Sequence, residues 1–145
     1  MQNYRSAVLF GYASLVTDVE EKLFAMELMT NSVVRQRWAN TRVPPNGAEM
    51  SSTSVLKVTV VNGSAKIRQG QPHDDKGDLQ DEGVLDRVWT GVVPLYPTLG
   101  EPLPGPYNRV HAPQYLTDFQ RDFNEVAKEQ ALSATVEPSE EKAKT

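Results

Sequence analysis

The sequence predicts a mainly β protein with helices, of the α+β class. Three features support this: an apolar run near the start, a second run in which apolar and polar residues alternate, and two segments with helical spacing. With 145 residues, 39% of them hydrophobic, the chain is long enough for one domain with its own core. It contains no cysteine, which excludes disulfides, thiolate catalysis and zinc-finger sites.

The apolar run YRSAVLFGYASLV, residues 4–16, predicts the first strand. Many of its residues are β-branched or aromatic, the types that strands favour. A strand this apolar normally has paired strands on both sides, yet only three residues precede it. We therefore expect residues 7–16 to leave an open apolar edge through which chains associate.

A first helix is predicted in TDVEEKLFAMELMTN. Thr17 and Glu20 have the spacing of a capping box, and apolar residues then recur every three or four positions. The helix should end at about Met29 or Asn31. A further helical turn is expected within residues 33–39, before the break at RVPPNG.

The segment LKVTV alternates between apolar and polar residues and predicts a half-buried strand. We expect Leu56, Val58 and Val60 to face the core, and Lys57 and Thr59 to face solvent.

The dipeptide Asn62-Gly63, which follows this strand, has two interpretations. It is a strong hairpin signal, which would return Ala65–Arg68 as another strand. The alternative is a glycine bulge within one bent strand.

The rest of the chain is predicted to be mostly loop, with one strand and one helix. In order, we expect an acidic loop with one short helical turn (71–83), a last strand (87–96), a proline-rich strap (94–113), an amphipathic helix (116–132) and a disordered tail (133–145). The total would be three or four strands.

Charge and hydropathy exclude several classes of partner. The net charge of −4, without a basic cluster, argues against nucleic acid. No apolar run approaches the roughly 20 residues that cross a bilayer, and no signal peptide is recognisable, so we expect a cytoplasmic protein without a membrane partner. His73, Asp74 and Asp75 are consecutive in a loop and do not converge on one ion, so no metal site is predicted.

Four segments carry a family resemblance. They are YRSAVLFGYA, TDVEEKLFAMELM, SAKIRQGQPHDD and VWTGVVPL, and GEPLPGP fits as well. Together they cover most of residues 4–113, and they resemble the pyridoxamine 5'-phosphate oxidase-like family, in the branch that includes nitroimidazole-resistance proteins and many fungal relatives. The resemblance is to the C-terminal half only. It implies a partial split β-barrel that binds flavin mononucleotide (FMN), over residues 1–115, with the N-terminal strands absent.

The resemblance also implies where the cofactor lies. In this family the FMN lies at a dimer interface, and Arg5 and Ser6 match a strand that runs close to it. A guanidinium and a hydroxyl suit phosphate oxygens; the alternative for Arg5 is a solvent-facing charge at a strand start. Lys66 and Arg68 project from one face and would steer an anionic cofactor, or are ordinary exposed cations.

Trp89 is the last candidate. It would present an aromatic edge to the flavin ring, with Gly91 allowing another backbone to approach; the alternative is a core tryptophan. No residue is assigned a catalytic role.

Two functions follow from the resemblance. The first is an FMN-dependent oxidoreductase that acts on a small organic molecule, forms a homodimer and is an accessory to natural-product (secondary metabolite) biosynthesis, as some fungal relatives are. The second is a truncated, non-catalytic half-barrel that acts as a binding or interaction module. Because the missing half supplies much of the phosphate site, we expect weak flavin binding, with a Kd on the order of micromolar or worse.

Overall fold

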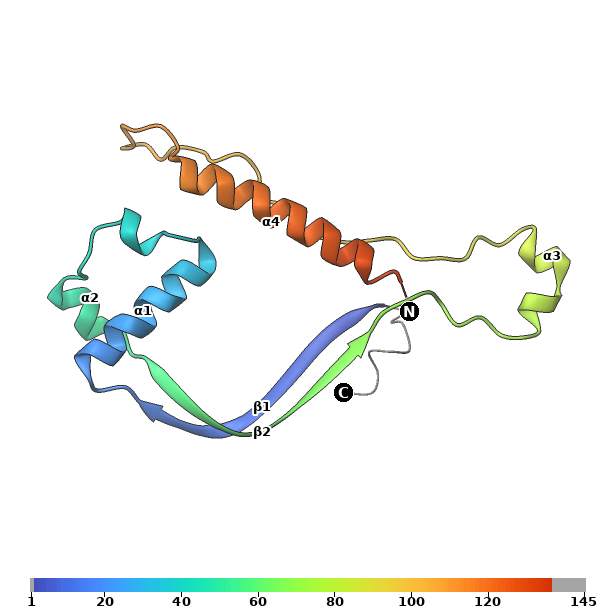
Figure 1. Ribbon diagram of the computed structural model, residues 1–145, viewed down its shortest axis with the longest axis horizontal. Coiled ribbons are helices and arrows are strands. Elements are labelled where there is room, and N and C mark those ends of the chain that lie inside the picture. The colour runs from blue at the N-terminus through green and yellow to red at the C-terminus, as the bar shows by residue number, and fades with distance from the viewer. Residues whose placement is uncertain (1, 137–145) are drawn as a thin grey trace. The chain divides into compact units, whose positions relative to one another are not determined.

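The computed structural model describes residues 2–136 and has an α+β fold (Figure 1). Its sheet has two antiparallel strands, β1 (Tyr4–Leu15) and β2 (Leu56–Arg68), and is open. The helices are α1 (Val19–Val33), α2 (Gly47–Ser52), α3 (Glu82–Leu85) and α4 (Gln114–Ser133), with 3-10 turns at Trp38–Asn40 and Asp78–Gln80. The predicted fold class, a partial split barrel with a C-terminal helix, is confirmed.

The chain divides into two compact units. In the described part, the first unit holds residues 2–7, 65–98 and 124–136, and the second holds residues 8–64 and 99–123. Both strands and α4 contribute residues to each unit. The domain bounds expected from the sequence remain a prediction, and residues 137–145 of the expected disordered tail lie outside the described residues.

β2 continues through Asn62-Gly63, so the hairpin interpretation is wrong and the single strand is right. A two-residue type I′ turn requires positive φ at both central residues, and over residues 2–136 neither is among the residues with positive φ. Gly63 faces β1 instead: a Cβ atom there would lie 3.3 Å from the Val8 carbonyl oxygen. The backbone of Asn62-Gly63 stays in the strand beside β1, whereas a turn at this point would break that pairing.

The strand predicted at residues 87–96 does not form, and the described sheet has two strands rather than three or four. The segment lacks a pairing partner among the described residues. Pro94 has no N–H to donate to a ladder, and Gly91 has φ +154°, outside the usual range of strands. An apolar composition without a partner strand therefore leaves an irregular segment.

α1 begins one residue later than predicted. Asp18, not Thr17, is its N-cap, and the Asp18 carboxylate accepts a hydrogen bond from the Glu21 N–H at 2.8 Å. The helix also continues past the predicted end to Val33. The helical turn expected within residues 33–39 lies slightly later, at Trp38–Asn40.

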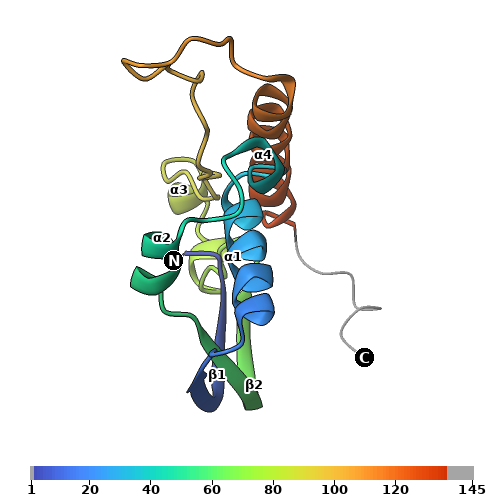
Figure 2. The ribbon, with the colours of Figure 1, turned by 90° about the vertical axis from the view of Figure 1, so that its left-hand side faces the viewer.

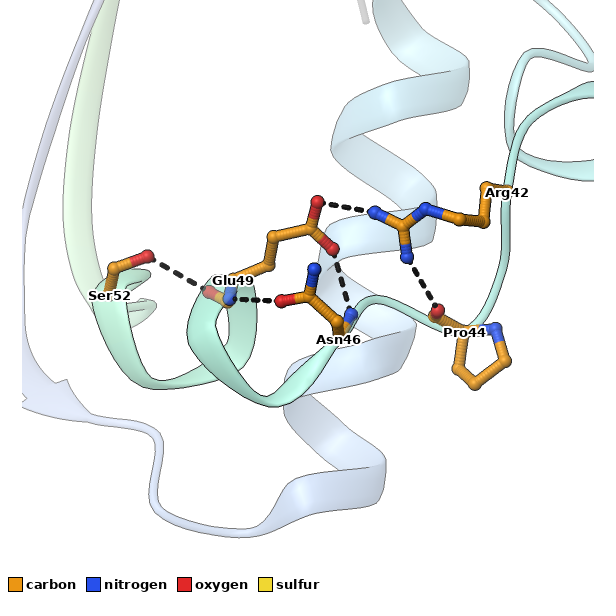
Figure 3. A network of polar contacts seen from close by, with 5 residues as sticks. All are labelled: Arg42, Pro44, Asn46, Glu49 and Ser52. Atoms are coloured by element: carbon orange, nitrogen blue, oxygen red, sulfur yellow. Dashed lines mark hydrogen bonds and ion pairs between the residues drawn. The ribbon is translucent and has the colours of Figure 1, made fainter.

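α2 was not predicted, although its signal is present in NGAEM. Asn46 and Glu49 form a capping box: the Glu49 N–H donates to the Asn46 side chain at 2.9 Å, and the Asn46 N–H donates to the Glu49 carboxylate at 2.8 Å (Figure 3). Arg42 donates to the same carboxylate and to the Pro44 carbonyl. The Arg42 hydrogen bond, followed by that from Asn46, lowers the pKa of Glu49. The lowered pKa of Glu49 means that its ionised form stabilises α2 when the pH is above the ordinary glutamate pKa. This stabilisation is lost as the pH falls through the lowered pKa of Glu49.

α1 and α2 lie side by side (Figure 1, Figure 2), and polar contacts join α1 to α2 and to β2. The Lys22 ammonium donates to the Met50 carbonyl. The Lys57 ammonium on β2 pairs with Glu21 on α1 at 2.6 Å, and this hydrogen bond raises the pKa of Lys57. An exposed ion pair contributes little to the stability of a fold. The main effect of the Lys57–Glu21 pair is therefore to orient α1.

The predictions for the acidic loop, the proline-rich strap and the C-terminal helix are largely confirmed. The acidic loop contains the turn Asp78–Gln80 and α3, and residues 94–113 form no helix or strand. α4 encloses the predicted helix at 116–132, and its Phe119 and Phe123 rings lie 6.1 Å apart. In residues 2–136, no helix combines the length and apolar character that crossing a bilayer requires.

The predicted core does not form on the β2 face. Among the described residues, the buried hydrophobic side chains are Val16 and Val55, which meet where the Val16 N–H donates to the Val55 carbonyl at 2.9 Å. Leu56, Val58 and Val60 are 65%, 52% and 51% exposed. No helix in the described part packs closely against the sheet, and a sheet face is buried only when a second layer covers it.

The closeness of the two strands gives a first test. A Cβ atom on Gly11 would lie 2.4 Å from the Thr59 carbonyl oxygen, which belongs to the backbone and cannot move aside. Gly11→Ala should therefore lower the free energy of unfolding by about 1–3 kcal/mol, measured by urea denaturation. Gly47→Ala is the control, because a Cβ there meets no atom within 4 Å and alanine favours a helix by about 0.5–1 kcal/mol. Equal stability of the two variants would contradict this strand pairing.

Candidate functional site

The four predicted site residues all belong to the first unit. Arg5 and Ser6 lie on β1, Lys66 lies on β2, and Trp89 lies in the irregular segment after α3. Because the strands are antiparallel, the end of β2 lies beside the start of β1 (Figure 1). The fold therefore brings Arg5, Ser6 and Lys66 to the same end of the sheet.

Arg5 and Lys66 are exposed cations without a carboxylate partner over residues 2–136. Elsewhere in the chain, cations such as Arg42 and Lys57 pair with carboxylates. A free guanidinium presents a planar fork of donors and a free ammonium presents a point charge, and both bind phosphate oxygens. This end of the sheet can therefore receive an anion.

Ser6 and Arg5 are consecutive within a strand, so their side chains leave opposite faces of the sheet. A phosphate that lies on one face can meet only one of them directly. The structure brings Arg5 and Ser6 to one strand end but not to one face.

Trp89 is 74% exposed, so the alternative of a core tryptophan is wrong for the described chain. Its indole lies over Gly91, where a Cβ atom would be 2.9 Å from Trp89 Cζ2. Gly91 therefore accommodates this ring, whereas the sequence suggested the approach of another backbone. The indole remains open to solvent and to a ligand.

Asn3 is a residue that the sequence analysis missed. Its side-chain amide donates to the carbonyls of Gly70, at 3.0 Å, and Ala134, at 2.9 Å. The Gly70 N–H also donates to the Ala134 carbonyl at 2.9 Å. These bonds tie the start of β1 to the residues that follow β2 and α4. No local pattern indicates them, because the partners lie 67 and 131 residues away.

Arg68, the predicted companion of Lys66, has a different environment. Its Nε atom is buried and has no hydrogen-bond partner among the described residues. A buried donor without a partner is costly, so an acceptor at this position would be stabilising. Arg68 thus adds one donor close to the end of β2.

A cavity of about 260 Å³ adjoins these elements within the first unit. It is lined by Gln2, Asn3, Gly91, Val92, Val93, Pro94, Leu95, Ala131, Ala134 and Thr135. The lining carries no charge and combines aliphatic side chains with the polar residues Gln2, Asn3 and Thr135. The cavity is slightly smaller than the roughly 300–1,000 Å³ of typical ligand pockets, so it can receive only part of a nucleotide-sized molecule.

The described residues show no metal centre: in residues 2–136, no three His, Asp or Glu side chains come together as ligands. His73 and the acidic residues that follow it form no such group. The candidate site therefore has Arg5 and Lys66 at one end of the sheet, with Trp89 and a small uncharged cavity in the same unit.

The chain is similar to known proteins in sequence and in structure. Residues 1–67 match the family described as pyridoxamine 5'-phosphate oxidase. The chain is similar to the flavocytochrome Anf3 from Azotobacter vinelandii, with 28% identity and a TM-score of 0.66, covering 81% of this chain and 53% of that one. It is also similar to the FAD and heme binding protein from Mycobacterium smegmatis, with 28% identity and a TM-score of 0.67, covering 81% and 56%. No match was found among curated proteins.

These findings support the pyridoxamine 5'-phosphate oxidase-like superfamily, a group of flavin-binding proteins, for this chain. The family match contains β1, α1, α2 and nearly all of β2, including Arg5, Ser6 and Lys66. The chain spans just over half the length of the two solved structures.

The contact between Trp89 and Gly91 is testable. Gly91→Ala should push the indole off the backbone and shift its fluorescence emission, because the new Cβ would collide with the ring and φ +154° strains any other residue. The measurement uses a Trp38→Phe background, so that Trp89 is the single emitter. Gly100→Ala is the control, since a Cβ there meets no atom within 4 Å. An unchanged emission spectrum in Gly91→Ala would contradict the contact.

Proposed function

We propose that the chain is a flavin-binding protein of the pyridoxamine 5'-phosphate oxidase-like family and acts as an FMN-dependent oxidoreductase on a small organic molecule. The observation that carries the proposal is the end of the sheet where Arg5 and Lys66 lie without carboxylate partners in the described chain. This end falls within the residues that match the family. The flavocytochrome and the FAD and heme binding protein support a flavin as the cofactor.

The residues present fit a flavin nucleotide. Arg5 and Lys66 would hold its phosphate through charge-assisted hydrogen bonds. Trp89 would stack against an aromatic ring, and the small uncharged cavity would shield part of that ring from water. When bound, the flavin supplies the redox chemistry, and the protein positions it and adjusts its electronic environment.

The affinity of the chain for FMN should be low. The cationic side chains are exposed, and one or two charge-assisted bonds contribute about 1.5–3 kcal/mol each. Micromolar binding needs about 8.2 kcal/mol. We therefore propose a Kd of roughly micromolar or weaker for this chain alone.

A titration with two flavins tests the site. Arg5→Ala should weaken FMN binding by about tenfold and leave riboflavin binding unchanged, because riboflavin lacks the phosphate. Flavin fluorescence quenching measures both, and a parallel FAD titration shows which nucleotide is preferred. Arg87→Ala, outside the site, is the control. Equal loss of FMN and riboflavin in Arg5→Ala would refute the phosphate contact, and no saturable binding of any flavin would refute the proposed cofactor.

A second candidate function is a non-catalytic half-barrel that acts as a binding or interaction module. The observation that favours it is the small amount of buried apolar surface in the described chain, where only Val16 and Val55 are buried hydrophobic residues. If the chain is such an interaction module, no flavin should bind to it, and it should still associate with another chain.

Association through the strands is part of both proposals. Apolar residues of β1 such as Leu9 and Phe10 are 66% and 56% exposed, and such surface is typical of interfaces. We propose a homodimer or a higher assembly formed through this strand.

Size-exclusion chromatography with light scattering tests the assembly. The chain should elute as a dimer or larger, and Leu9→Glu should shift it toward the monomer because a charge would enter the apolar interface. The control is Leu28→Glu on α1, where the leucine is 55% exposed against 66% for Leu9, and it should leave the assembly intact. A compact monomer for the unaltered chain would contradict the proposal.

The finer assignments rest on the sequence segments alone. We propose the nitroimidazole-resistance-like branch of fungal type and an accessory role in natural-product biosynthesis. The support is the ordered set of segments from YRSAVLFGYA to VWTGVVPL.

A further inference from the structure

The second unit contains a larger cavity that the flavin proposal does not use. Its volume is about 810 Å³, within the roughly 300–1,000 Å³ of small-molecule pockets. The proline-rich strap forms much of its wall, together with the first turn of α4 and the turn at Trp38–Asn40. None of Arg5, Ser6, Lys66 and Trp89 lines it.

The charged groups of this cavity have one sign. Arg37 and Arg109 line it, and no Asp or Glu does. The Arg37 guanidinium donates to the Tyr115 hydroxyl through Nη1 at 3.1 Å. This bond uses one of five guanidinium donors, so it orients the group and leaves the others for a ligand.

Two other arginines of the same unit already have carboxylate partners. Arg35 pairs with Asp122 at 3.5 Å, and Arg121 pairs with Asp118 at 2.9 Å. Over the described residues, Arg37 and Arg109 have no such ion pair. Two guanidinium groups that face a cavity without a counter-charge are suited to bind an anion from solution.

The remaining walls are mixed: Asn40 and Asn108 add uncharged polar groups, and several aliphatic side chains add apolar surface. Leu103, Val110, Pro113 and Leu116 contribute aliphatic surface, which favours an uncharged body of moderate size. We propose that this cavity binds a small organic anion, with a phosphate or carboxylate group at Arg37 and Arg109 and an apolar body against the strap. The proposal is independent of flavin binding.

The test uses phenyl phosphate, benzoate and benzyl alcohol as probes, observed by ligand-detected NMR with the full chain. Phenyl phosphate and benzoate should bind saturably, since each joins an anionic group to a ring. Benzyl alcohol, without charge, should bind at least tenfold more weakly, and inorganic phosphate, without a ring, should also bind at least tenfold more weakly. The relative affinities of the first two probes show which anionic group is preferred.

Three variants locate the binding. Arg37→Gln and Arg109→Gln should each weaken phenyl phosphate binding about tenfold, the loss expected from one charge-assisted contact. Arg87→Gln, an exposed arginine outside the cavity, should bind like the unaltered chain. FMN titration and thermal melting of each variant separate this result from loss of the flavin site or of folding. Unchanged phenyl phosphate binding in both cavity variants, or an equal loss in Arg87→Gln, would overturn the proposal.

Discussion

The pairing of β1 with β2 is the interaction on which the rest of the structure depends. The two strands are separated by α1 and α2 in sequence, and their antiparallel alignment starts at Val16 and Val55, the two buried hydrophobic residues of the described chain. Gly11 permits the close approach of the backbones, since any larger residue would collide with the Thr59 carbonyl. The same alignment carries Lys66 back to the start of β1, where Arg5 lies, so the candidate phosphate site is a direct consequence of the strand pairing.

This pairing satisfies the backbone of the strands but does not bury their side chains. Apolar surface removed from water stabilises a fold by roughly 25 cal/mol per Å², and here Leu56, Val58 and Val60 gain only part of that benefit because each is at least half exposed. A sheet of two strands is marginal by itself. The hydrogen-bonded ladder therefore sets the geometry of the site, while a covering layer for the apolar faces is what the proposed assembly would provide.

The sequence predicts the elements whose signals are local, and it fails where a partner decides the outcome. The helical spacing after Thr17 and after Pro113 is correct because helix hydrogen bonds close within the segment. Asn62-Gly63 and the segment around Trp89 depend on non-local pairing: β1 holds the former in a continuous strand, and the latter lacks a partner among the described residues. Arg5 and Lys66 were recognisable from family resemblance, whereas the double hydrogen bond of Asn3 spans the chain and has no sequence signature.

The charge distribution explains why the two proposed sites are credible in an acidic chain. With 19 acidic and 15 basic residues, carboxylates are in excess. Four cations each form an ion pair with a carboxylate: Arg35, Arg42, Lys57 and Arg121. Over residues 2–136, other cations such as Lys76 and Arg87 also lack an ion pair, so a candidate site needs two unpaired cations placed together. Arg5 with Lys66, at the end of the sheet, and Arg37 with Arg109, in the strap cavity, are two such pairs in the described residues. A pair of free cations concentrates local positive potential against the net charge of the molecule, and anionic ligands are the partners that this potential selects.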